Sequence, residues 1–144
     1  MRADYLNESS GSTFHYKKNV EMVTAARTLT AKDSGKVLTL DSAGGAYSIT
    51  LPTATSGEQG THYKFIVWEE TPTAAITIAA GSAIISLVMK DPGGNASNST
   101  AGTQVSNIVV GTTAQKGDYI NAMFWQGEWV AECMSGINNA VTTS

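Results

Sequence analysis

Short segments of alternating apolar and polar residues constrain the fold of this chain more than any other feature. The stretch from Gly35 to Pro52, GKVLTLDSAGGAYSITLP, contains two such segments around a Gly-Gly pair. Their apolar residues are Val37, Leu38 and Leu40, and then Tyr47, Ile49 and Leu51. A period of two places one row of side chains in a core and the other in water. We therefore expect a hairpin of two strands that meet at the Gly-Gly pair and end at Pro52.

Further strand signals follow at regular intervals, separated by clusters of Gly, Pro, Asn, Asp and Ser. The expected strands are Arg27–Ala31, Lys36–Asp41, Tyr47–Leu51, His62–Glu69, Ala75–Ala79, Ile84–Val88, Val105–Val110, Asp118–Trp125 and Glu128–Met134. Strong helix patterns are absent between them, which excludes a doubly wound α/β sheet. The sequence predicts an all-β domain over residues 27–136, an antiparallel sandwich or jelly-roll-like fold or a barrel.

The last two expected strands form a hairpin whose register can be worked out. A two-residue turn at Gln126 and Gly127 pairs Trp125 with Glu128, and glycine supplies the positive φ that tight hairpins favour. The register then pairs Phe124 with Trp129, Ala122 with Ala131, and Ile120 with Cys133. One face of this hairpin is therefore apolar and suited to a core.

The opposite faces of two strands are also rich in apolar residues. In the segment from His62, the residues Tyr63, Phe65 and Val67 form the inward row. The other rows contain Ile66, Trp68, Met123 and Trp125. A sheet face in water does not need these four side chains, so we expect them to pack against a second sheet or a neighbouring subunit.

Residues 1–26 differ from the rest of the chain and are expected to form an extended N-terminal arm. They are polar, with apolar residues at irregular spacing, and they include a linker-like NESSGST segment. Those apolar residues are Tyr5, Leu6, Phe14, Tyr16, Val20 and Met22. Ordering a terminal segment costs conformational entropy, so an arm with six large apolar residues makes most sense if it docks on its own domain, a sister subunit or another protein. Residues 90–104 are expected to form an exposed flexible loop, and residues 137–144 a C-terminal tail.

Composition narrows the class of protein further. The chain has 144 residues, enough for one domain with a core of its own, and a single cysteine, which excludes an internal disulfide framework. The net charge is −3, which argues against nucleic acid as a partner because such affinity depends on Lys and Arg. No apolar run approaches the roughly 20 residues of a membrane-spanning helix, and MRADYLNESS lacks the apolar region of a secretory signal.

Residues that could carry chemistry do not form a recognisable site. His15, His62 and Cys133 lack the spacing of zinc ligands. Glu69 with Glu70 and Glu128 with Glu132 could in principle act as a glycosidase pair, but they read equally well as charges that protect strand edges. We expect no catalytic residues, no cofactor and no metal, and hence no enzyme.

The order of the segments resembles that of capsid decoration (cement) proteins and related β modules of tailed bacteriophages. The resemblance covers residues 27–134 and rests on RTLTAKDSGKVLTL, a GG turn into YSITLP, then HYKFIVWE, ITIAA and DYINAMFWQGEWV. It implies a β-rich homo-oligomer, with a trimer favoured, that binds the outer capsid surface of a virion. The resemblance also implies that the chain is synthesised in the host cytoplasm. The implied partners are the major capsid protein and further copies of the chain, with arms that clamp neighbouring capsomers.

Two functions remain open at this point. The first is capsid decoration, with docking through the arm residues and subunit contacts through Ile66, Trp68, Met123 and Trp125. The alternative is a tail-fibre or spike module that binds host surface glycans, with the loop 90–104 at its tip and Trp68 or Trp125 stacking on sugar rings. An enzyme is the least favoured class, because no nucleophile–base pair is apparent.

Overall fold

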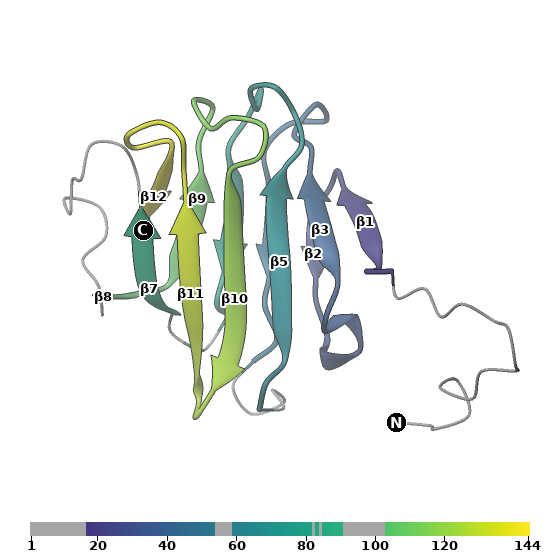
Figure 1. The fold of residues 1–144 in the computed structure, drawn as a ribbon, viewed down its shortest axis with the longest axis vertical. Coiled ribbons are helices and arrows are strands. Elements are labelled where there is room, and N and C mark those ends of the chain that lie inside the picture. The colour runs from purple at the N-terminus through teal and green to yellow at the C-terminus, as the bar shows by residue number, and fades with distance from the viewer. Residues whose placement is uncertain (1–16, 54–58, 82, 84, 91–102) are drawn as a thin grey trace, which may run out of the picture.

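Two β-sheets packed face to face make up the computed structural model of this chain (Figure 1), which describes residues 17–53, 59–81, 83, 85–90 and 103–144. Sheet A has the order β1-β3-β5-β10-β11-β7-β8, and sheet B has the order β12-β9-β6-β4-β2. The strands of sheet A are β1 (Val20–Val23), β3 (Val37–Leu40), β5 (His62–Val67), β10 (Tyr119–Trp125), β11 (Glu128–Met134), β7 (Ile85–Lys90) and β8 (Thr103–Val105). Those of sheet B are β12 (Val141–Thr143), β9 (Asn107–Val110), β6 (Ile76–Ala79), β4 (Tyr47–Thr50) and β2 (Arg27–Thr28). The predicted all-β sandwich is confirmed.

The core lies between the two sheets and is dominated by aromatic residues of sheet A. Trp129, Tyr63, Phe65 and Phe124 are all buried. The ring centroid of Trp129 lies 5.6 Å from that of Tyr63 and 5.4 Å from that of Phe124, which it meets edge-on. The polar atoms of these rings are satisfied inside the protein: Trp129 Nε1 donates to the carbonyl of Pro52 (3.3 Å), and Tyr63 Oη to that of Thr30 (2.7 Å). Burying aromatic area with every polar atom paired is a large stabilising contribution.

The register of the β10–β11 hairpin is confirmed. Trp125 pairs with Glu128, Phe124 with Trp129, and Ile120 with Cys133. The turn has positive φ at both central residues, 49° at Gln126 and 89° at Gly127, as a type I′ turn requires. The turn residues therefore determined the pairing.

The expected hairpin within Gly35–Pro52 is wrong. β3 pairs with β1 and β5 in sheet A, whereas β4 pairs with β2 and β6 in sheet B. Residues 41–46 carry the chain from one sheet to the other, and Gly45 adopts a φ of 109° in this crossing. Each strand has one apolar row facing the core, and those rows face each other across the sandwich instead of lying side by side.

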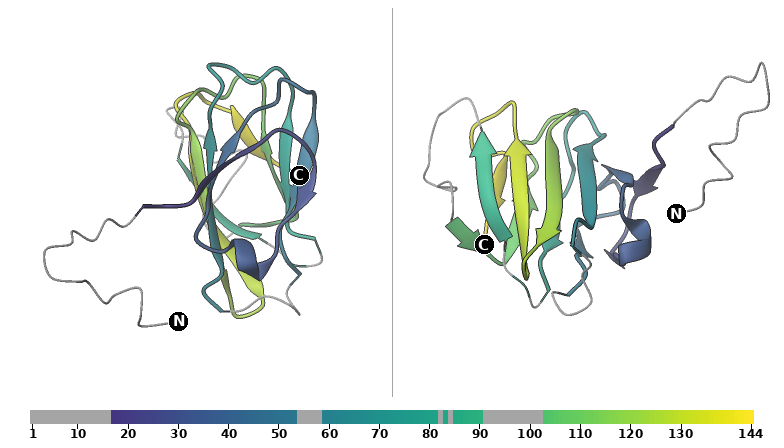
Figure 2. Two further views of the ribbon diagram at one scale, coloured as in Figure 1. Left: turned by 90° about the vertical axis from the view of Figure 1, so that its right-hand side faces the viewer. Right: turned by 60° about the horizontal axis from the view of Figure 1, so that its bottom comes forward.

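The prediction of purely antiparallel sheets is also wrong, because both sheets are mixed. β1, β3 and β5 run parallel in sheet A, and β2, β4 and β6 run parallel in sheet B. Three successive strand–crossing–strand units therefore stack on one another, and Figure 2 shows the two layers that they form. β11 and β7 are parallel as well, while the remaining pairs are antiparallel.

The crossings between the sheets are held by buried polar groups. Ser42 Oγ donates to Glu69 Oε2 (2.7 Å) and accepts from the backbone N–H groups of Thr73 (2.9 Å) and Ala74 (3.1 Å). Asp118 likewise accepts from the N–H groups of Gln115 (2.9 Å) and Gly136 (2.8 Å). These side chains join loops that are distant in sequence, and they satisfy backbone donors that no strand partner reaches.

Three segment boundaries differ from those expected. The sandwich begins inside the expected arm, since β1 pairs with β3 and Val23 is buried. The expected C-terminal tail contains β12, which pairs with β9 and buries Val141. The expected loop 90–104 is bounded by the end of β7 and the start of β8, and its residues 91–102 lie outside the described part of the chain.

Candidate interaction surface

The outer face of sheet A carries most of the exposed large apolar side chains in the described residues. Nine such side chains are exposed, and eight of them belong to strands of sheet A or directly follow β5. These eight are Val20, Met22, Trp68, Val88, Met123, Trp125, Val130 and Met134. A concentration of exposed apolar side chains on one face of a small domain is typical of a contact surface for another protein.

The outer face of sheet B differs in chemistry. Its outward row on β4 and β6 includes Ser48, Thr50 and Thr77, and Thr142 continues it on β12. None of the exposed large apolar side chains among the described residues lies on a strand of sheet B. The two faces of the sandwich are therefore unequal, and the exposed large apolar side chains of the described strands gather on that of sheet A.

A polar strip crosses the middle of the outer face of sheet A. The cross-strand register places Lys64 beside Asn121 and Asn121 beside Glu132. Lys64 Nζ lies 4.7 Å from the ring centroid of Tyr119, and Tyr119 Oη donates to Glu132 Oε1 (3.2 Å). Desolvation, and then the neighbouring Glu132 carboxylate, raise the pKa of Tyr119, so its hydroxyl stays protonated and remains a donor.

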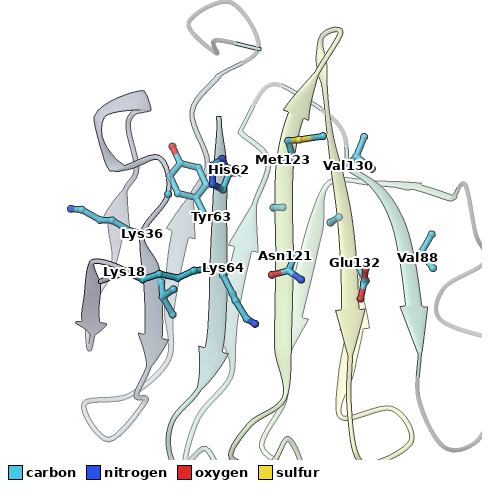
Figure 3. A pocket seen from close by; sticks show the side chains of 14 residues that line it. Lys18, Lys36, His62, Tyr63, Lys64, Val88, Asn121, Met123, Val130 and Glu132 are labelled. Carbon is cyan, nitrogen blue, oxygen red and sulfur yellow. The ribbon is translucent and has the colours of Figure 1, made fainter. Parts of the chain in front are cut away.

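A shallow groove of about 670 Å³ runs along this strip (Figure 3). Basic side chains line it on the side of β1, β3 and β5, and apolar ones line it on the side of β10, β11 and β7. The basic side consists of Lys18, Lys36, Lys64 and His62, while Met123, Val130 and Val88 form the apolar side with Glu132 among them. The groove is suited to an extended segment that is polar at one end and apolar at the other.

Charged residues close the edge of the sandwich between β1 and β2. Glu21 pairs with Arg27 across the two sheets, and Lys36 Nζ contacts both Glu21 Oε2 (3.0 Å) and Asp33 Oδ1 (2.6 Å). The hydrogen bond from Lys36 is the main reason that the pKa of Asp33 falls to about 2, and Lys36 and Arg27 also lower the pKa of Glu21. Charged side chains at a sheet edge discourage the addition of further strands. The charged cluster therefore protects this edge of the sandwich against the addition of a further strand.

The residues predicted as contact sites divide into two groups. Tyr5, Leu6, Phe14 and Tyr16 lie outside the described residues. Val20 and Met22 were assigned to the arm, but they lie on β1 and are exposed on the outer face of sheet A. Trp68, Met123 and Trp125 are exposed on this same side of the molecule, and Ile66 is partly buried there.

Two apolar residues of the groove were not predicted as contact residues. Val88 on β7 is the cross-strand partner of Glu132, and Val130 lies two residues before Glu132 on β11. Their period-two position was visible in the sequence, but the parallel pairing of β7 with β11 was not. That pairing brings Val88 beside Glu132 and extends the apolar side of the groove.

The described residues contain no group of three or more His, Cys, Asp and Glu side chains that could hold a metal ion. Cys133 is buried, and desolvation raises the pKa of its thiol, which does not favour a nucleophile. Glu128 accepts from Ser86 Oγ (2.9 Å), and Glu132 accepts from Tyr119. The Cα atoms of these two glutamates are about 13 Å apart along an extended strand, a wide spacing for a glycosidase pair.

A scan against protein-family models finds no match, and a search of curated proteins finds no similar sequence. Within the part of the chain that the structure describes, no helix is long and apolar enough to cross a membrane. The interaction surface is therefore interpreted from its own geometry and chemistry.

Proposed function

We propose that this chain is a structural protein of a phage virion, one that binds the outer capsid surface and stabilises it without catalysing a reaction. The observation that carries the proposal is the apolar outer face of sheet A, with Met22, Trp125 and Met134 exposed on three of its strands. A monomer in water gains nothing from this face, whereas a subunit of a large assembly buries it. The order of strand segments along the chain resembles that of decoration proteins. This resemblance is the reason that we propose a capsid as the assembly.

Two kinds of contact contribute in this proposal. Copies of the chain associate, as a trimer in the first instance, through the outer face of sheet A. The residues before Lys17, with Tyr5 and Leu6 near their start, bind the major capsid protein. Linked weak contacts of this kind give stable capture, because each bound arm raises the effective concentration of the next.

The proposal is tested by removing residues 1–16. This deletion preserves β1, whereas removal of the whole expected arm would also take Val23 out of the core. The shortened chain should keep its circular dichroism spectrum but no longer sediment with expanded, empty capsids. Full capsid binding by the shortened chain would contradict capsid docking through this segment.

A glycan-binding tail-fibre module is the second candidate. It is favoured by the groove itself, because Lys64, Asn121 and Glu132 offer both donors and acceptors to sugar hydroxyls, and Trp125 is exposed on the same strand as Asn121. Quantitative mass spectrometry of purified virions separates the two candidates. Hundreds of copies per particle support decoration, whereas a few copies support a tail fibre.

A further inference from the structure

The groove on sheet A lies where the N-terminal segment of the chain begins its path. Lys18 lines the groove, and the carbonyl of Asn19 accepts a hydrogen bond from the N–H of Val37 (2.9 Å). This bond fixes the chain beside β3 at the rim of the groove. Residues 17–19 project from β1 on the outer side of sheet A, as the purple segment in the left view of Figure 2 shows. The chain therefore enters β1 from the side of sheet A on which the groove lies.

The length of chain before Lys18 matches the width of the groove. From β1 to β10 there are three strand spacings, about 14 Å in total. Four extended residues, from Lys18 back to position 14, span about 13 Å. Phe14 can therefore reach the apolar side of the groove at Met123.

The residue pattern also matches the chemistry of the groove. In an extended chain, residues 14, 16 and 18 share one face. Since the side chain of Lys18 faces the groove, Tyr16 and Phe14 would face it as well. Tyr16 would then lie over the polar part near Lys64 and Asn121, where its hydroxyl finds partners, and Phe14 over Met123 and Val130.

We infer that residues 13–16 cross the outer face of sheet A of their own chain and fill this groove, with Phe14 on Met123 and Val130 and with Tyr16 beside Lys64. The docking does not depend on the proposed capsid function. It divides the N-terminal segment into a docked part, residues 13–16, and a tip that contains Tyr5 and Leu6. Residues 7–12, from the linker-like segment, separate the two parts. The tip then leaves the domain from a defined point.

The test uses the full chain with ¹³C-labelled methionine methyl groups and nuclear magnetic resonance. Met123 is assigned through a Met123→Leu variant, and Met134, which lies farther along the sheet, serves as the internal control. An aromatic ring seated on Met123 shifts its methyl resonance upfield. The double variant Phe14→Ala/Tyr16→Ala should lose this shift and leave Met134 unchanged, while the matched variant Tyr5→Ala/Leu6→Ala should leave both resonances unchanged.

Two results would overturn the inference. The first is an identical Met123 resonance in the natural chain and in Phe14→Ala/Tyr16→Ala, together with no nuclear Overhauser contact between Met123 and Phe14 in the natural chain. The second is a Met123 shift that disappears on dilution, which would make a second copy the source of the ring. In Tyr5→Ala/Leu6→Ala, loss of capsid binding with a retained upfield shift of Met123 would support both the docking and the proposed function. Retained capsid binding in this variant would count against the proposed function alone.

Discussion

Trp125 and Trp129 lie on opposite faces of the same hairpin, so that Trp129 is fully buried while Trp125 is half exposed. Trp129 contacts Tyr63 and Phe124 in the core. Trp125 stands at the end of the outward row of β10, beyond Tyr119, Asn121 and Met123. One hairpin thus supplies both the centre of the core and a large exposed side chain of the candidate interaction surface.

Replacing each tryptophan with alanine should separate stability from association. Trp129→Ala should lower the free energy of unfolding by about 3–5 kcal/mol, because it opens a cavity among buried aromatic rings. Trp125→Ala should change it by no more than about 0.5 kcal/mol, since its side chain is exposed. Urea unfolding followed by circular dichroism measures both values. Equal losses would show that the faces of the hairpin are assigned incorrectly.

The apolar side chains of sheet A should matter for association and the hydroxyl side chains of sheet B should not. We expect Trp125→Ala with Met134→Ala to weaken self-association by roughly tenfold or more, the scale of a lost interface anchor. Thr77→Ala with Thr142→Ala is the matched control on the opposite face and should leave association unchanged. Sedimentation velocity over a range of concentrations measures the effect. A stronger effect from the sheet B pair would contradict an interface on the outer face of sheet A.

Ser42 should contribute to stability more than its size suggests. Its hydroxyl accepts from two backbone N–H groups and donates to Glu69, and the residue is fully buried. Ser42→Ala leaves these buried groups without their partner, so we expect a loss of about 1–3 kcal/mol in the free energy of unfolding. The control Ser48→Ala removes a hydroxyl from the exposed row of β4 and should have little effect. Similar results for the two variants would contradict the role of Ser42 in holding the crossings.

The charged edge of the sandwich should give the protein an acid-sensitive contribution to stability. Because hydrogen bonds from Lys36 and Thr30 lower the pKa of Asp33 from 3.8 to about 2, its carboxylate stabilises the folded state above pH 4. This contribution is lost as the pH falls from 4 to 2. We expect Asp33→Asn to cost about 1 kcal/mol at pH 7 and to flatten the dependence of unfolding on pH in that interval. Parallel pH profiles for the natural chain and Asp33→Asn would rule out this contribution.

The features predicted correctly from the sequence are those set by residues close together along the chain. The β10–β11 register follows from a two-residue turn and two rows of alternating side chains, and it was predicted correctly. The same alternation identified β3 and β4 but not their partners. Alternation predicts only that one row of side chains is buried, and it does not say in which sheet the strand lies. Leu38 and Ile49 are both buried in the core, but they belong to different sheets.

The elements that were missed depend on tertiary context. β1 and β12 each bury a single apolar residue, Val23 and Val141, so they lack a buried row, and they exist because β3 and β9 offer them free edges. The charged cluster was missed for a similar reason. Glu21, Arg27 and Lys36 come together only because successive strands alternate between the sheets.

The most direct test of the central claim, that the outer face of sheet A is a protein contact surface, is hydroxyl-radical footprinting of the free chain and of the chain within purified virions, where the proposed function places it. Met22, Met134 and Trp125 are exposed on this face, and Trp129 provides the buried reference. We predict that these three residues are oxidised several-fold more slowly in the virion than in the free chain, while Trp129 is protected in both. Equal oxidation rates for the three residues in the two states would contradict the claim.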